Sequence, residues 1–193
     1  VKKHKFITDI VASEMGISME ISLISVLLTY LVGFPLGVSM AKKPGGFWDK
    51  VGNAFIVLNY AIPALVFYLF MKSWTGDKNG IFGFAGFGYQ YDSERHFQTL
   101  FIPVFVIFFL SIPGLVIWVR RFMVDELNSD YVKFARSKGL SENRIMYTHV
   151  LRNASVPLIR NIPITILTAM VGSYFVEDIW VIPGTGRELV TAL

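Results

Sequence analysis

Four long apolar stretches constrain this 193-residue chain more than any other feature. They cover residues 21–40, 51–71, 100–119 and 154–176, and Arg160 in the last stretch is their only charged residue. A helix that rises about 1.5 Å per residue needs roughly 20 residues to cross the hydrocarbon core of a bilayer. The stretches therefore predict four membrane-spanning helices.

The charge content supports a membrane protein over a soluble helical bundle. Charged residues make up 17% of the chain, whereas a soluble domain carries about a quarter. Helices buried in a soluble bundle would show a polar face in most turns, and these stretches do not. We predict an all-α fold, a polytopic membrane helical bundle. The absence of cysteine excludes disulfides and thiolate metal sites.

The basic residues predict how the chain is oriented. Cytoplasmic loops carry an excess of Lys and Arg, and ten of the 18 basic residues fall in the loops 42–50 and 120–153. These ten are Lys42, Lys43, Lys50, Arg120, Arg121, Lys133, Arg136, Lys138, Arg144 and Arg152. Both loops are therefore expected in the cytoplasm, and the net charge of +4 indicates orientation rather than nucleic-acid binding.

The segment before the first stretch, residues 1–18, is expected on the outer face, as a short surface helix. A chain that starts outside without a signal sequence needs an earlier spanning helix. Because the sequence begins at Val1 with no such signal, we expect a fragment of a longer chain.

Polar residues inside the stretches are candidates for a pore lining, because amides in mid-membrane usually face the bundle or a water-filled path. The candidates are Asn59, Tyr60, Ser111 and Asn161. Ordinary kinks and interhelical hydrogen bonds would account for each of them equally well. Arg160 either extends its side chain to the headgroups as an interfacial anchor or lines the pore.

The loop 120–153 contains two helical signals. Asn128, Ser129 or Asp130 can cap a helix that runs to Lys138, and Gly139 is a natural C-terminal stop. Ser141 can cap a second short helix from Glu142 to about His149. The pattern predicts a helix-turn-helix on the inner membrane face, and a helix pair that binds lipid would show the same pattern.

This loop resembles a known family. The run from Asp130 to Ser141, followed by Arg144, His149, Leu151, Arg152 and Asn153, looks like the EAA-type coupling loop of ABC importer permeases of the oligopeptide and dipeptide branch. Ala135, Gly139 and Leu151 keep the register of the general pattern, while its Glu, first Ala and Pro are absent. The stretch 7–40, with Phe-Pro-Leu-Gly at 34–37, resembles the first conserved span of this permease domain. The segment 176–187 resembles the outer loop before the final helix, and its Pro-Gly-x-Gly-Arg form is similar to the B-type permease subunit.

The resemblance covers roughly residues 7 to 193 and implies a type-1 ABC importer transmembrane domain over 19–193. It implies a transport subunit without catalysis of its own, in the cell (inner) membrane of a bacterium. The implied partners are a second permease subunit, two cytosolic ATPase subunits that hold ATP and Mg²⁺, an extracellular substrate-binding protein, membrane lipid and a peptide substrate. The implied ATPase-coupling residues are Ala135, Gly139, Leu140, Ser141, Glu142, Asn143, Arg144, Met146 and Leu151.

The residues themselves predict no catalytic, cofactor or metal site in this chain. The sequence lacks the GxxxxGK[ST] phosphate loop and the HExxH motif. Two other functions stay open on the sequence alone. One is an ion-coupled secondary transporter, which would usually place a charge at mid-membrane. The other is a non-transporting membrane scaffold or sensor. Peptide, nickel and glutathione importers look alike at these motifs.

Overall fold

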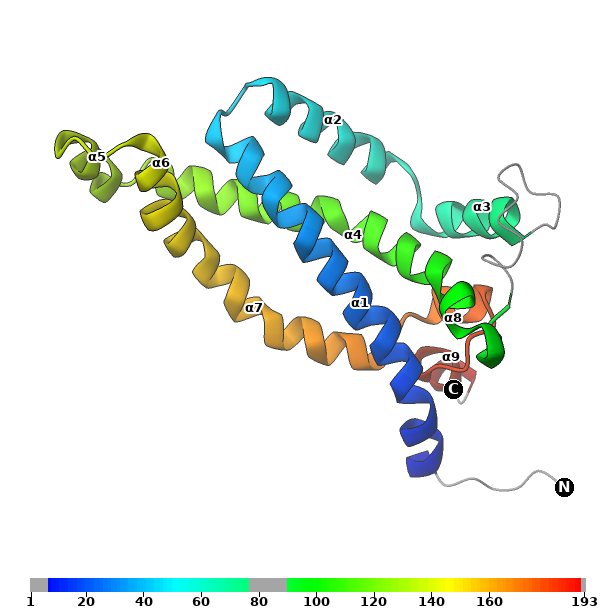
Figure 1. Ribbon diagram of the computed structural model, residues 1–193. Coiled ribbons are helices and arrows are strands. Elements are labelled where there is room, and N and C mark those ends of the chain that lie inside the picture. Colours follow the sequence, from blue (N-terminus) through cyan, green and yellow to red (C-terminus); the bar gives the residue numbers. More distant parts are fainter. Residues whose placement is uncertain (1–6, 77–89, 192–193) are drawn as a thin grey trace, which may run out of the picture. The chain divides into compact units, whose positions relative to one another are not determined.

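The structure is a computed structural model that describes residues 7–76 and 90–191, and it is all-α throughout this part of the chain (Figure 1). The helices are α1 (Ile7–Lys42), α2 (Phe47–Ala61), α3 (Ala64–Gly76), α4 (His96–Leu127), α5 (Asp130–Ser137), α6 (Glu142–Arg144), α7 (Leu151–Val171), α8 (Tyr174–Ile179) and α9 (Thr185–Thr191). A 3₁₀ turn, η1 (Ser93–Arg95), precedes α4, and a π-helical segment, η2 (Ile145–Val150), joins α6 to α7.

The chain forms two compact units, which are described separately. Unit 1 consists of Val1–Leu27, Ile62–Leu110 and Ile164–Leu193, and unit 2 consists of Leu28–Ala61 and Ser111–Pro163. The helices α1, α4 and α7 each contribute residues to both units.

Two of the predicted spans correspond to single long apolar helices. Within the described residues, Glu14–Lys42 of α1 and Ser93–Leu127, which is η1 with α4, are long and apolar enough to cross a membrane. The pair α2 and α3 makes a third span if the interrupted pair counts as one. The described residues therefore provide two or three spans rather than the four that were predicted.

The second predicted span, 51–71, is wrong as a continuous helix. The helix α2 ends at Ala61 and α3 begins at Ala64, after a break at Ile62–Pro63. Proline lacks an amide hydrogen and disfavours the helical conformation of the residue before it. The Pro63 carbonyl then accepts the amide of Phe67 at 3.1 Å, which begins the new helix.

The fourth predicted span, 154–176, also has the wrong bounds. The helix α7 ends at Val171, because Gly172 takes a left-handed φ of +76°, and Val176 lies in the separate helix α8. The described part of α7 does not reach the apolarity of a span, since polar residues interrupt it. These residues are Arg152, Asn153, Ser155, Arg160 and Asn161.

Two predicted boundaries are also displaced. The helix α1 is continuous from Ile7, so residues 7–18 belong to α1 and do not form a separate short helix. The helix α4 continues past Val119 to Leu127, so the first turns of the predicted inner loop are still helical.

The core of unit 2 lies where α1, α4, α5, η2 and the start of α7 pack together. Its buried members are apolar and come from all five elements. They are Val38, Ala41, Val119, Met123, Val132, Ala135, Ile145, Met146, Val150, Ala154 and Leu158. The core therefore fixes α5 and η2 firmly to the inner ends of α1 and α4.

Glycines on α1 let α4 approach closely in this unit. A Cβ atom at Gly37 would lie 2.7 Å from the Val119 Cβ and 3.1 Å from the Val116 carbonyl oxygen. A Cβ at Gly33 would lie 3.2 Å from Leu115. Small residues at one face permit the close backbone packing that membrane helices use. This contact explains the glycine of the 34–37 stretch.

We expect Gly37→Ala to destabilise the protein by about 1–3 kcal/mol, because the new methyl group collides with the stiff β-branched Val119 side chain and with backbone. The matched control is Gly16→Ala on the same helix, where a Cβ meets nothing within 4 Å. Alanine is the better helix former there, by about 1 kcal/mol. Thermal unfolding of the purified protein in detergent measures both, and equal midpoints would contradict the close contact.

Candidate functional site

The helix α5 ends in a Schellman motif at Gly139. Gly139 has a φ of +75°, its amide donates to the Arg136 carbonyl at 2.9 Å, and the Leu140 amide donates to the Ala135 carbonyl at 3.3 Å. Leu140 then packs against the core that contains Ala135, which is the apolar contact typical of this motif. The predicted helix stop at Gly139 is therefore confirmed, and the chain direction after α5 is fixed.

An ion pair crosses the turn between α5 and α6. The Arg136 Nε donates to Glu142 Oε1 at 2.8 Å and Nη2 donates to Oε2 at 3.1 Å. The hydrogen bonds from Arg136 hold the pKa of the Glu142 carboxyl below its ordinary value. Both side chains are largely exposed, so water screens the pair and it contributes little to stability.

The second helix of the predicted helix-turn-helix does not stop at His149. The segment from Glu142 continues through the π-helical η2 into α7, which ends at Val171 (Figure 1). Ser141 stands at the N-cap with extended backbone, as predicted, but its side chain makes no capping hydrogen bond. The Ile145 amide bonds the Ser141 carbonyl instead, at 3.0 Å. The result is one helical segment, 142–171, with a π turn near its start.

The nine predicted coupling residues divide by exposure. Ala135 and Met146 are buried in the core, and Leu140 and Leu151 are half-buried against it. The exposed members form the tip of the segment, and they are Gly139, Ser141, Glu142, Asn143 and Arg144. The structure therefore brings all nine together in unit 2, but only the five residues of the tip are exposed.

Two aromatic residues near the tip were missed as candidate contact residues. Phe134 is 61% exposed, with the Lys138 ammonium 4.4 Å from its ring centre, and Tyr147 is 47% exposed, with the Lys42 ammonium 4.7 Å from its ring centre. Exposed aromatic side chains paired with cations are common anchors of protein interfaces. The signal in the sequence was an aromatic residue on the polar side of each short helix.

A cavity of about 450 Å³ lies within unit 2 between α1, α4 and α7. It is lined by Tyr30, Leu115, Trp118, Phe122, Pro157, Leu158, Arg160 and Asn161. Among the predicted pore residues, Asn161 lines this cavity, whereas Asn59 is buried in α2 and Tyr60 and Ser111 are exposed elsewhere in the unit. Arg160, which is exposed, lines the cavity beside Asn161. The cavity lining therefore contains a cation and the aromatic side chains of Tyr30, Trp118 and Phe122.

A buried ion pair that the sequence did not reveal connects α2 to α4. The Asp49 carboxylate is only 4% exposed, and it accepts hydrogen bonds from the Arg120 Nε at 2.6 Å and Nη2 at 2.9 Å. It also accepts the Gly45 amide at 2.7 Å and the Asn53 side-chain amide at 3.1 Å. Arg120 is therefore a structural partner of α2 as well as one of the basic residues that predict orientation.

In unit 1, the Glu177 carboxylate is buried and organises the segment 172–187. It accepts the Ser18 hydroxyl at 2.8 Å and the Ser173 amide at 3.2 Å on Oε1, and the Arg187 amide at 2.9 Å on Oε2. A Cβ at Gly172 or Gly184 would collide with this carboxylate. The glycines of the Pro-Gly-x-Gly-Arg stretch therefore leave room for a buried acid that binds α8 and α9 to α1.

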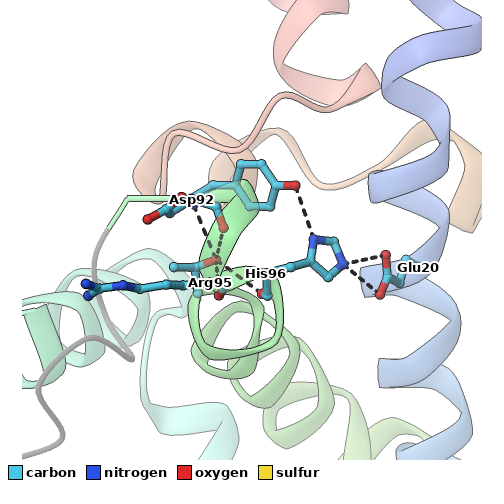
Figure 2. Close-up of polar contacts among 6 residues, drawn as sticks. Glu20, Asp92, Arg95 and His96 are labelled. Atoms are coloured by element: carbon cyan, nitrogen blue, oxygen red, sulfur yellow. Dashed lines mark hydrogen bonds and ion pairs between the residues drawn. The ribbon is translucent and has the colours of Figure 1, made fainter.

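A second polar cluster in unit 1 joins α1 to the start of α4 (Figure 2). The His96 Nε2 lies 3.0 and 2.9 Å from the two Glu20 oxygens, and its Nδ1 lies 3.1 Å from the Tyr91 hydroxyl. Asp92 caps η1 by accepting the Glu94 amide at 3.0 Å. Burial, followed by the charges of Glu20 and Asp92, raises the pKa of the Tyr91 hydroxyl. The sequence predicted no such link, because Glu20 and His96 lie far apart along the chain.

Within the described residues, no group of three or more His, Cys, Asp or Glu side chains could hold a metal ion. The polar clusters instead connect helix to helix. Together with the apolar helices, they define an α-helical domain of a multi-pass membrane protein.

The chain belongs to the family described as binding-protein-dependent transport system inner membrane component, whose model matches residues 33–193. This family is the transmembrane part of type-1 ABC importers, and its members are permease subunits of bacterial inner membranes. The family disfavours both the ion-coupled transporter and the membrane scaffold.

Its relatives are permeases of peptide importers. The chain is 31% identical over 173 residues to the oligopeptide transport system permease protein AmiC of Streptococcus pneumoniae, covering 89% of this chain and 33% of AmiC. It is 30% identical over 193 residues to the oligopeptide permease AppB of Bacillus subtilis, covering 98% and 61%. It is 26% identical over 187 residues to the dipeptide permease DppB of Lactococcus lactis, covering 97% and 59%. The chain thus spans from a third to three fifths of these relatives.

We expect Glu177→Gln to destabilise the protein by about 1–3 kcal/mol, because an amide offers one acceptor oxygen where the carboxylate uses two, and a buried donor is left unpaired. Glu188→Gln is the matched control, since Glu188 is exposed on α9 nearby. The thermal unfolding midpoint of the purified protein in detergent measures both. A Glu177 variant as stable as the Glu188 variant would show that the buried acid does not hold this segment.

Proposed function

We propose that this chain forms half of the translocation pathway of an ATP-driven importer of oligopeptides or dipeptides. The support is the family and the names of the relatives, which are oligopeptide and dipeptide permeases. A second permease subunit completes the pathway, and an extracellular binding protein delivers the peptide. ATP and Mg²⁺ bind on two cytosolic ATPase subunits, so this subunit is not itself an enzyme.

The observation that carries the coupling role is the continuity of the helical segment 142–171. Its exposed start, Glu142–Arg144, belongs to the tip, and no loop separates these residues from α7. The core residues Ile145, Met146 and Val150 clamp the next turn to α1 and α4. A displacement imposed on the tip therefore passes directly into α7.

The ATPase contact in this proposal is a helix in a groove. Arg144 is exposed and makes no ion pair within the described residues, so its guanidinium is available to a partner. Phe134 and Tyr147 add exposed aromatic surface on either side of the tip. Closure of the ATPases on ATP would push the tip, and the spans would shift between outward- and inward-open states as rigid bodies.

Arg144→Glu should abolish most ATP-driven peptide uptake by the reconstituted transporter while leaving its thermal stability unchanged, because the reversed charge faces the partner and not this chain. Arg152→Glu, an exposed arginine farther along the same helical segment, is the control. Uptake into proteoliposomes and ATP hydrolysis are measured together. Undiminished uptake by the Arg144 variant would show that the tip does not couple.

Gly139→Ala should lower uptake severalfold, because alanine at a φ of +75° costs about 1–2 kcal/mol and redirects the tip. Gly45→Ala is a matched control, since Gly45 has the same φ of +75° and, like Gly139, has no neighbour within 4 Å of an added Cβ. Both substitutions therefore impose the same backbone strain. Equal uptake by the two variants would mean that strain alone, and not the position of the tip, sets transport.

A further inference from the structure

We propose that the cavity between α1, α4 and α7 in unit 2 is a binding site for the headgroup of an anionic phospholipid. This inference does not depend on which substrate the importer carries. It rests on the composition of the cavity wall, on the position of Arg160 and on the apolar surface around the opening.

The wall of the cavity suits a group with one negative charge and an apolar remainder. Arg160 supplies a guanidinium, Asn161 an amide and Tyr30 a hydroxyl, and the lining residues include no acid. Arg160 makes no ion pair with any described residue. An arginine in an apolar setting favours a phosphate or carboxylate, to which it can donate two parallel hydrogen bonds.

A second cation contacts one of the aromatic residues that line the cavity. The Arg121 guanidinium lies 5.6 Å from the ring centre of Trp118, which lines the cavity. Arg121 is exposed, one residue after the Arg120 that pairs with Asp49. Trp118 and Phe122 stack with ring centres 5.4 Å apart, and both line the cavity. Aromatic side chains near basic residues are typical of the headgroup level of a membrane.

The three helices that line the cavity also present an apolar surface. Exposed apolar side chains stand next in sequence to lining residues, and these are Leu31 on α1, Ile117 on α4 and Ile159 on α7. Arg160 lies on α7 about 14 Å from its start at Leu151, at a rise of about 1.5 Å per residue. Acyl chains can lie on this surface while the headgroup enters the cavity.

The volume and chemistry of the cavity favour a lipid over a peptide. A volume of about 450 Å³ lies within the range of small-molecule sites, about 300–1,000 Å³, and accommodates a headgroup with its glycerol. A bound peptide would bring many amide groups that need hydrogen-bond partners. Only Tyr30, Arg160 and Asn161 among the eight lining residues offer a hydroxyl, a guanidinium or an amide for them. A phosphodiester needs the guanidinium and one or two further donors.

The test uses the complete transporter, purified in detergent. It is titrated with phosphatidylglycerol or with phosphatidylcholine of identical acyl chains. Native mass spectrometry counts the bound lipid molecules. Wild type should hold phosphatidylglycerol about fivefold more tightly than phosphatidylcholine, the ratio expected for one basic residue. Arg160→Gln should lose this preference, and Arg160→Lys should keep it. Arg152→Gln, which removes an exposed arginine of α7 outside the cavity lining, should also keep it.

Equal binding of the two lipids by wild type would overturn the proposal, and this comparison needs no variant that might misfold. Equal losses in the Arg160 and Arg152 variants would also overturn it, because general surface charge would then account for the preference. A third contrary result would be displacement of the lipid by a peptide with a free C-terminal carboxylate but not by its amidated form. The cavity would then be a site for the transported substrate.

Discussion

Two buried carboxylates, those of Asp49 and Glu177, hold the ends of the helices in this chain. A helix that ends in an apolar environment leaves amide hydrogens without partners, and each one costs free energy if it stays unpaired. Asp49 accepts the Gly45 amide between α1 and α2, and Glu177 accepts the Ser173 and Arg187 amides around α8 and α9. Asp49 thus pairs an amide of the exposed turn between α1 and α2, and Glu177 pairs two amides of the partly buried segment around α8 and α9, each in its own unit.

The features that the sequence predicts correctly are local. A long apolar run predicts α1 and α4 because length and hydropathy decide membrane insertion, and Gly139 predicts a helix stop because its backbone conformation excludes most other residues. Proline is less decisive. It breaks the helix at Pro63, yet Pro35, Pro157 and Pro163 lie inside continuous helices. Whether a proline ends a membrane helix depends on what else can satisfy the freed carbonyl.

The features that the sequence does not reveal are contacts between distant residues. Asp49 and Arg120 are 71 positions apart, and Ser18 and Glu177 are 159 apart. A single sequence shows each of these residues but not its partner. The motif around Gly184 therefore identified the segment and gave no reason for its glycines. The reason is the bulk of a buried side chain that must approach the backbone of its own segment.

The ion pairs of unit 2 differ in a way that matters for coupling. The Asp49 carboxylate is largely removed from water, whereas the Arg120 side chain is 31% exposed, and loss of Arg120 would leave a buried charge without its cation. Arg136 and Glu142 are exposed, and water screens such a pair so that it contributes little to stability. In the proposed coupling, a partner that replaces the contacts of Glu142 at the tip would break no buried pair, whereas separating α2 from α4 would. A displacement of the tip would then reach α7 along the continuous helical segment, and the inner ends of α1 and α4 through the core that they share with η2.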